Sequence, residues 1–291
     1  MKAIIFGSNG MLGYYLKKYI SQKYVYVIPI TRKEYDLVNL NEKSLDNLLR
    51  NCGIDENTVI INAAGVIPSS SKDQTERDFY KINSIFPILL SNIASKYKSK
   101  MIHITTDCVF SGNDGNYNEN NLHDATDSYG ISKSLGEYCN CTIIRTSIIG
   151  QEKYNKRSLL EWVIENREKE INGYANHYWN GVTCLELSKI IHRIITENLY
   201  WSGVRHIFTP EAVNKYQLLN MINEVYGLNI TVNKFYTDKK IDKTISTVYE
   251  TNSTFKIKNL ISQVKELFEY KIQIFLFLRL IYFCLYFIYL S

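Results

Sequence analysis

Tyr129 and Lys133 lie four residues apart in the segment 128–133, which reads SYGISK. Residues with this spacing share one face of an α-helix, so an ammonium at Lys133 can act on a phenol at Tyr129. A free tyrosine has a pKa of about 10 and is a poor acid–base catalyst at neutral pH. A cation close to the phenol favours the phenolate and lowers this pKa. The pair therefore indicates general acid–base chemistry, although the spacing alone is equally typical of an exposed helix.

A glycine-rich turn near the N-terminus indicates a binding site for a dinucleotide. The apolar run 2–6 precedes it, and residues 14–19 continue with helical periodicity. Glycines let the backbone approach a pyrophosphate, and the N–H groups at the start of the following helix hold the anion. The spacing G-x-x-G-x-x-G differs from the usual dehydrogenase fingerprint and indicates the short-chain dehydrogenase variant, rather than a turn without a ligand. The turn consists of Gly7, Ser8, Asn9, Gly10, Met11, Leu12 and Gly13.

The elements that must position these groups alternate along the chain. Apolar segments that favour β-strands span residues 2–6, 24–30, 58–62, 101–105 and 142–145, with room for a helix between neighbours. This alternation predicts an α/β fold with a Rossmann-type, doubly wound parallel sheet, whose ligands bind beyond the carboxyl ends of the strands. The residues that follow the strands are Thr31 and Arg32, then Asn62, Ala63, Ala64 and Gly65, then Thr106 and Asp107.

The end of the second predicted strand favours NADPH. It lacks the acidic residue that binds a ribose 2′-hydroxyl in NAD sites, and Arg32 stands nearby. An arginine suits a 2′-phosphate, so NADPH is predicted, with NADH as the alternative. The alternative that Arg32 is an ordinary surface residue beside Lys33 and Glu34 stays open. Asp36, which Leu37 follows, is placed to accept a hydrogen bond from the adenine amino group.

The composition fits one cytoplasmic enzyme. The chain has 291 residues, 45% of them hydrophobic, which is enough for a full core. The net charge of +5 comes from basic residues interleaved with acids, which favours a solvated surface over a nucleic-acid groove. Six cysteines without a cleavable signal suggest reduced thiols, and the pair Cys139 and Cys141 lacks the second cluster of a zinc site. We therefore expect neither a metal nor a nucleic-acid partner.

The pattern predicts two lobes and a tail. Residues 1–150 are predicted to form an NADP-binding Rossmann domain, completed by about 183–208, and residues 151–182 and 209–267 a smaller C-terminal substrate-binding lobe. Predicted elements in this half are helices at 158–167, 185–198 and 215–226, and strands at 204–208 and 229–234.

The apolar tail, 268–291, is ambiguous. Residues 272–290 come close to the roughly 20 residues that span a bilayer, but Arg279 near their middle costs about 2.5–3.5 kcal/mol there. Three interpretations stay open: a membrane anchor, which the length favours, a helix packed on the enzyme or on a second subunit of a homodimer, and an extension without a role.

Four motifs in order resemble the extended short-chain dehydrogenases, and within them the dTDP-4-dehydrorhamnose reductase family. They are IIFGSNGMLG at 4–13, VIINAA at 59–64, ITTDCVF at 104–110 and YGISKSLGE at 129–137. The similarity covers residues 1 to about 267. Arg145-Thr146-Ser147 at the end of the strand predicted at 142–145, and Asn83 in a predicted helix at 79–90, also fit the layout of that family.

The resemblance implies reduction of a sugar ketone, which requires a hydride from the nicotinamide and a proton for the developing alkoxide. Tyr129 would deliver the proton, while Lys133 would lower its pKa and bind the nicotinamide ribose. Thr106 would orient and polarise the carbonyl, and Asp107 and Cys108 would face the sugar. The cofactor would contact the seven residues of the glycine turn together with Arg32, Asp36, Leu37, Asn62, Ala63, Ala64, Tyr129 and Lys133.

Two positions depart from the family in the predicted sugar pocket. Cys108 stands where members that use dTDP-4-dehydrorhamnose usually have Tyr, and Ile148 stands where they have Trp. The segment 179–183, WNGVT, also lacks a proline that often precedes this threonine. The reaction type is therefore predicted more firmly than the sugar, because the altered pocket could accept a different nucleotide-linked 4-keto-6-deoxy sugar.

We therefore predict an NADPH-dependent reductase of a nucleotide-linked 4-keto-6-deoxy sugar in surface-polysaccharide biosynthesis. One alternative is a nucleotide-sugar epimerase or dehydratase of the same fold, which would keep its cofactor bound and recycle it. The other is a non-catalytic NADP-binding regulatory subunit similar to the β subunit of methionine adenosyltransferase, since such a relative can retain Thr106, Tyr129 and Lys133.

Overall fold

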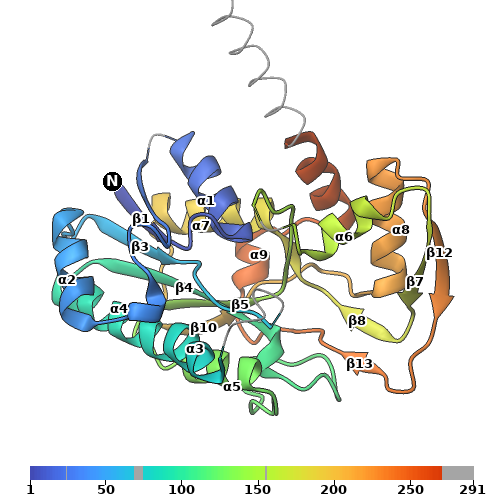
Figure 1. The fold of residues 1–291 in the computed structure, drawn as a ribbon, viewed down its shortest axis with the longest axis horizontal. Helices are drawn as coiled ribbons and strands as arrows, with labels where there is room; N and C mark the ends of the chain where they lie inside the picture. The colour runs from blue at the N-terminus through green and yellow to red at the C-terminus, as the bar shows by residue number, and fades with distance from the viewer. Residues whose placement is uncertain (24, 69–74, 155, 271–291) are drawn as a thin grey trace, which may run out of the picture.

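A computed structural model describes residues 1–23, 25–68, 75–154 and 156–270, and Figure 1 shows their fold. Its centre is a six-stranded sheet in the order β10-β5-β4-β3-β1-β2, in which all neighbours are parallel. The strands are β1 (Lys2–Phe6), β2 (Tyr26–Ile30), β3 (Thr58–Asn62), β4 (Lys100–Thr106), β5 (Thr142–Thr146) and β10 (Gly203–His206). The predicted Rossmann-type, doubly wound parallel sheet is thus confirmed.

Helices cover both faces of this sheet. One face carries α1 (Met11–Ser21) and α7 (Cys184–Thr196), and the other carries α2 (Glu42–Asn51) and α4 (Phe86–Lys96). Successive side chains of a strand point to opposite faces, so Ala3 and Ile5 of β1 join the first core. Ile4 and Phe6 join the second. Burial on both faces is why β1 is an uninterrupted apolar run.

The strand order reverses beside β1. The chain runs from β1 to β2 on one side and then crosses to β3 on the other side of β1. Connections that leave β1 and β3 in opposite directions make room for a ligand at the carboxyl ends of these strands. The glycine-rich turn follows β1 and therefore lies at this switch point.

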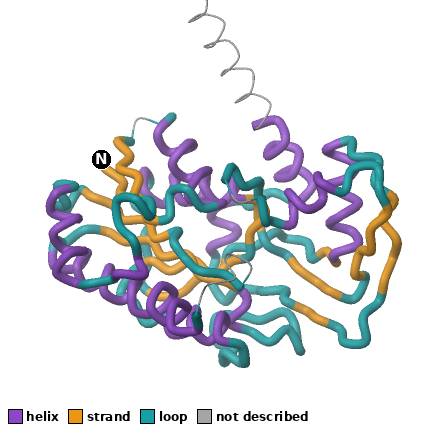
Figure 2. The backbone as a smooth tube through the Cα atoms, viewed as in Figure 1, coloured by secondary structure: helices purple, strands orange, loops and turns teal. Residues whose placement is uncertain are grey.

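Two smaller sheets and two helices lie toward the right of Figure 1, and Figure 2 shows their strands in orange. The first sheet pairs β7 (Glu170–Tyr174) with β12 (Thr231–Phe235), and the second has β8 (His177–Trp179) between β11 (Val213–Asn214) and β13 (Ile241–Asp242). The helices are α6 (Leu159–Glu165) and α8 (Lys215–Tyr226). These elements fall in the ranges predicted for the substrate-binding lobe, whose boundaries and role stay predictions.

The remaining elements are short. They are η1 (Leu37–Asn39), α3 (Glu76–Phe79), η2 (Tyr80–Ile85), η3 (Asp107–Val109), α5 (Ser128–Leu135), β6 (Ile148–Ile149), β9 (Val182–Thr183) and α9 (Thr251–Phe255).

Most predicted boundaries agree with the structure within two residues. The helix at 215–226 coincides with α8, and the strand at 204–208 corresponds to β10, which lies beside β5. The strand predicted to begin at Asn229 begins at Thr231 instead. Asn229 has a φ of 54° and so occupies the left-handed region, which no strand residue adopts.

The C-terminal end of the described chain is packed. Residues 260–270 are helical, and the Phe268 ring lies 4.8 Å from the ring of Tyr226. Tyr270 packs near Tyr15, with 6.3 Å between ring centroids. Within the described ranges, no helix combines the length and the apolar character that crossing a bilayer requires. The three interpretations of residues 272–290 concern a segment outside the described residues.

The cysteines of the described residues are free thiols. Cys139 and Cys141 are buried in the core under α2 and α4, as packing residues would be. The neighbouring Cys139 and burial raise the pKa of Cys141. Over residues 1–23, 25–68, 75–154 and 156–270, no three His, Cys, Asp or Glu side chains gather as a metal site would require.

Candidate active site

The end of β4 and the start of α5 bring Thr106 and Tyr129 together. α5 begins where the Asp127 carboxylate accepts a hydrogen bond from the Gly130 N–H at 2.9 Å. A Cβ on Gly130 would lie 2.5 Å from the Cys108 carbonyl oxygen, so the helix contacts the turn that follows β4 closely. The side chains of Tyr129 and Thr106 lie close together, and the Thr106 hydroxyl lowers the pKa of the phenol.

Lys133 is buried one helical turn further on. A Cβ on Gly65 would come within 2.7 Å of its Nζ and 3.3 Å of the Asn83 Oδ1. The ammonium therefore lies against the loop after β3, which forms part of the dinucleotide pocket described below. The predicted catalytic residues Thr106, Tyr129 and Lys133 thus gather at one edge of the sheet.

A distorted helix supports the arrangement of Thr106, Tyr129 and Lys133. The helical run α3-η2-α4 contains a π-helical turn, Tyr80–Ile85, and Asn83 sits in it fully buried. Its amide accepts from the Val66 N–H at 2.9 Å and donates to the Val66 carbonyl at 3.0 Å and to the Ser132 hydroxyl at 3.1 Å. Asn83 therefore ties the loop after β3 to α5. π-helical turns are frequent at functional sites.

Burial, rather than Lys133, dominates the titration of Tyr129. Burial raises the pKa of the phenol well above 10, and the nearby Cys108 and Asp107 raise it further. The expected lowering of this pKa by Lys133 is therefore wrong for the protein without its ligands. Burial also lowers the pKa of Lys133 to about 8, although Glu137 opposes this shift. A neutral phenol is the form that donates a proton.

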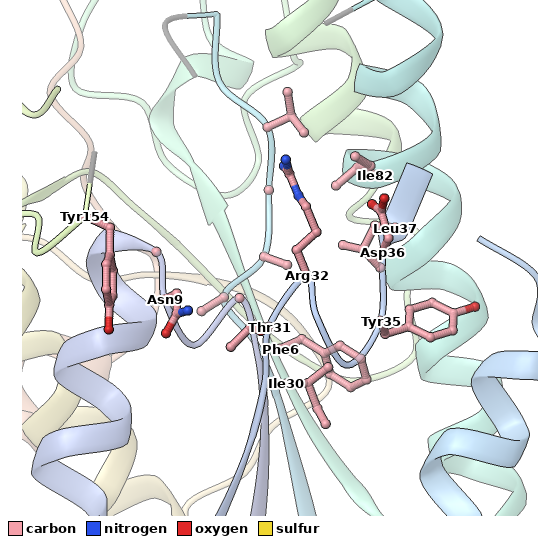
Figure 3. A pocket seen from close by; sticks show the side chains of 16 residues that line it. Phe6, Asn9, Ile30, Thr31, Arg32, Tyr35, Asp36, Leu37, Ile82 and Tyr154 are labelled. Atoms are coloured by element: carbon pink, nitrogen blue, oxygen red, sulfur yellow. The ribbon is translucent and has the colours of Figure 1, made fainter. Parts of the chain in front are cut away.

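A cavity of about 490 Å³ lies at the carboxyl ends of β1, β2 and β3. Figure 3 shows the Arg32 side chain extending into it, with Asn9 on one side and Asp36 and Leu37 on the other. Its lining includes the predicted residues Gly7, Asn9, Gly10, Arg32, Asp36, Leu37, Ala63 and Ala64. A cavity at this switch point fits a dinucleotide.

Close backbone contacts fix the shape of the glycine turn, whose residues Ser8, Met11, Leu12 and Gly13 do not line the cavity. Gly7 has a φ of +72°, and a Cβ there would lie 2.7 Å from the Ala64 backbone. A Cβ on Gly13 would collide with the Gly7 carbonyl, so the helix can start this close to the turn only without a side chain. Ser8 is buried, and its hydroxyl donates to the Ile30 carbonyl at 3.2 Å. Met11 and Leu12 begin α1.

Asn62 supports the cavity through a contact that the sequence did not reveal. Its Oδ1 accepts from the Ala64 N–H at 3.1 Å, and its Nδ2 lies 3.1 Å from the Nδ1 of His103. Burial lowers the pKa of His103 to about 3, so this imidazole is neutral and accepts from the amide. His103, which lies in β4, therefore orients Asn62. Contacts between neighbouring strands leave no signal in local sequence.

Tyr154 also lines the cavity, opposite Arg32 in Figure 3. It lies in a loop without a motif, so sequence patterns offered no signal for it.

The RmlD substrate binding domain family matches residues 1–263. The chain belongs to this family. The predicted relation to the extended short-chain dehydrogenases and dTDP-4-dehydrorhamnose reductases is confirmed. The predicted enzyme class, an oxidoreductase that acts on a nucleotide sugar, is confirmed with it.

Relatives agree with the membership in the RmlD family. The spore coat polysaccharide biosynthesis protein SpsK of Bacillus subtilis is 24% identical over 263 residues, which cover 87% of this chain and 89% of that protein. A dTDP-4-dehydrorhamnose reductase of Aggregatibacter actinomycetemcomitans is 31% identical over 155 residues, covering 51% and 49%. A dTDP-4-dehydrorhamnose reductase of Bacillus anthracis, solved with NADP, shares the fold with a TM-score of 0.76 at 21% identity, covering 92% and 98%.

The two predicted sugar-facing residues lie next to Thr106. The Thr106 hydroxyl donates to the Asp107 carboxylate at 3.1 Å and accepts from the Cys108 N–H at 3.1 Å. Asp107 is buried, and burial raises its pKa. Burial also raises the pKa of the Cys108 thiol to about 12, so this side chain is neutral.

Proposed function

We propose that this member of the RmlD family reduces the 4-keto group of a nucleotide-linked 4-keto-6-deoxy sugar with NADPH. The observation that carries the proposal is the close approach of Thr106 and Tyr129, with Lys133 buried beside the dinucleotide cavity. The names of the relatives support a role in the synthesis of surface polysaccharides.

The chain's own residues would divide the work as follows. Tyr129 is a neutral phenol and would donate the proton to the sugar oxygen. Thr106, whose hydroxyl lies close to Tyr129, would orient the same oxygen. Lys133 would stabilise the phenolate that forms. When bound, NADPH supplies the hydride.

The cavity fits NADPH better than NADH. Glu34, the acid nearest the end of β2, accepts hydrogen bonds from the Thr31 N–H at 2.8 Å and its hydroxyl at 2.5 Å. Glu34 does not contribute to the cavity lining in the described part of the chain, whereas Arg32 does. A free guanidinium at this place suits a 2′-phosphate.

A direct assay tests the proposal. Purified protein is mixed with NADPH and a panel of 4-keto nucleotide sugars while the nicotinamide absorbance is followed. We expect stoichiometric oxidation with one sugar. Turnover without net oxidation would favour an epimerase or dehydratase. No oxidation with any sugar, together with tight binding to another enzyme, would favour the regulatory subunit.

Replacing Arg32 with Ala tests the cofactor preference. We expect the KM for NADPH to rise about 10- to 150-fold, because a charged hydrogen bond contributes about 1.5–3 kcal/mol. The KM for NADH should change by less than about twofold, since NADH has no 2′-phosphate. Steady-state kinetics with both cofactors measure the two values.

Lys33→Ala is the matched control for this variant. It removes the adjacent positive charge, and Lys33 is exposed and absent from the cavity lining described above. Both KM values should stay near those of the wild type. Equal losses with NADPH and NADH in Arg32→Ala would show that Arg32 does not recognise the 2′-phosphate.

A further inference from the structure

Two lysines from the second half of the chain reach the end of β4. Lys243 follows β13, and its ammonium donates a hydrogen bond to the carbonyl of Phe110. A Cβ on Gly112 would come within 3.1 Å of the Lys243 Cε. Lys243 is therefore fixed against the turn that carries Asp107 and Cys108.

Lys215 approaches the same turn from another element. It is the first residue of α8, and its Nζ lies 5.3 Å from the centroid of the Trp179 ring. Trp179 is buried, and its ring lies so close to Gly181 that a Cβ there would collide with it.

Gly181 in turn approaches the site. A Cβ on it would also collide with the carbonyl of Ser147, the residue that follows β5. The Ser147 side chain lies close to the Asp107 carboxyl and lowers its pKa. Across this short path Lys215 lowers the pKa of Asp107. Asp107 and Cys108 in turn raise the pKa of Lys215.

The cluster of Asp107, Cys108, Lys215 and Lys243 has a surplus of positive charge. Asp107 is its single carboxyl, and burial raises the pKa of that group. The Cys108 thiol is neutral, and burial and Lys215 lower the pKa of the nearby His177. Within the described ranges neither lysine forms an ion pair, whereas the neighbouring Lys240 contacts Asp242 at 3.2 Å.

The position of Lys215 in its helix adds to this surplus. The N-terminus of α8 carries the positive end of the helix dipole, where a cation is disfavoured unless an anion lies close. Burial opposes the charge as well and lowers the pKa of Lys215. Asp107 and the Trp179 ring offset part of this cost, and an anionic ligand would offset the rest.

We propose that Lys215 binds the diphosphate of the nucleotide sugar, with Lys243 adding to the attraction. This inference rests on the proposed function. A hexose whose C4 ketone contacts Thr106 and Tyr129 carries its diphosphate on C1, across one sugar ring from these residues. Lys215 and Lys243 both lie near Asp107, the neighbour of Thr106, so we place that diphosphate beside them.

The test measures the binding of nucleoside diphosphates rather than turnover. Isothermal titration calorimetry is carried out with dTDP, UDP and GDP on protein saturated with NADP, so that the dinucleotide cavity is filled. At least one of these should bind the wild type. Lys215→Gln is expected to weaken that binding about 10- to 100-fold, the usual loss for a hydrogen bond to a charged group. The dissociation constant of NADP should be unchanged.

Two further variants complete the experiment. Lys240→Gln, which removes a lysine that Asp242 already neutralises, should leave the affinity within about twofold of wild type. Lys215→Arg should recover most of it, because the charge is kept. Thermal melting should show Lys215→Gln to be at least as stable as wild type, since a cation leaves a helix N-terminus.

The outcomes separate this inference from the proposed reduction. Equal affinity in wild type and Lys215→Gln, or no binding of any nucleoside diphosphate, would overturn the role of Lys215 even if sugar reduction is observed. Binding that depends on Lys215, without reduction of any 4-keto sugar, would leave the diphosphate site standing while the proposed reaction fails.

Discussion

Replacing Tyr129 with Phe is expected to lower kcat by about 10²- to 10⁴-fold, the usual contribution of a positioned general acid. The change removes only the hydroxyl. The ring packs near Phe79, with 6.3 Å between centroids, and phenylalanine preserves this contact. The KM for NADPH should stay near its wild-type value, because the cofactor cavity is lined by other residues. Steady-state kinetics with the sugar that oxidises NADPH measure both constants.

The fold should survive this substitution. Thr106 keeps its hydrogen bonds to the Asp107 carboxylate and from the Cys108 N–H, so no buried group is orphaned. Tyr138→Phe is the matched control, because Tyr138 lies just beyond the same helix and is 78% exposed. It should keep full activity. Wild-type kcat in Tyr129→Phe would remove this residue from the mechanism.

Local patterns predicted the parts of the site that lie at strand ends. The apolar runs of β1 and β3 agree with the structure residue for residue, because burial on both faces leaves a continuous signal. The parallel sheet then places Ala63, Ala64 and Thr106 at one edge. The spacing of Tyr129 and Lys133 on α5 adds the acid–base pair to that edge.

The missing parts depend on contacts between distant segments. Asn83 was noted only as fitting a family layout, and its π-helical turn has no signature in the local sequence. The pairing of His103 with Asn62 joins neighbouring strands, and the approach of Lys215 to Asp107 joins the small sheets to the large one. The direction of the Tyr129 pKa was mispredicted because spacing shows which charge is near, whereas burial depends on the whole fold.

Replacing Lys133 with Met is expected to impair both catalysis and cofactor binding. We expect kcat to fall by about 10²-fold or more, because no ammonium then stabilises the phenolate of Tyr129. The KM for NADPH should rise as well, since Lys133 Nζ lies against Gly65, which lines the cofactor cavity. The melting temperature at neutral pH should not fall, because burial of an ammonium is unfavourable and Met fills a similar volume. A loss confined to kcat would show that Lys133 does not contact the cofactor.

The pH profile distinguishes this role from a structural one. Burial lowers the pKa of Lys133 to about 8, so the ammonium is present below that pH and is lost above it. The kcat/KM for NADPH reports groups of the free enzyme, and for the wild type it should therefore fall as the pH rises through about 8. Tyr129 contributes no alkaline limb there, because its pKa is raised. Lys133→Met should have lost this limb, while Lys81→Met, which removes a lysine bonded to the Val38 carbonyl, should retain it. An identical alkaline limb in wild type and Lys133→Met would assign the titration to another group and leave Lys133 with packing alone.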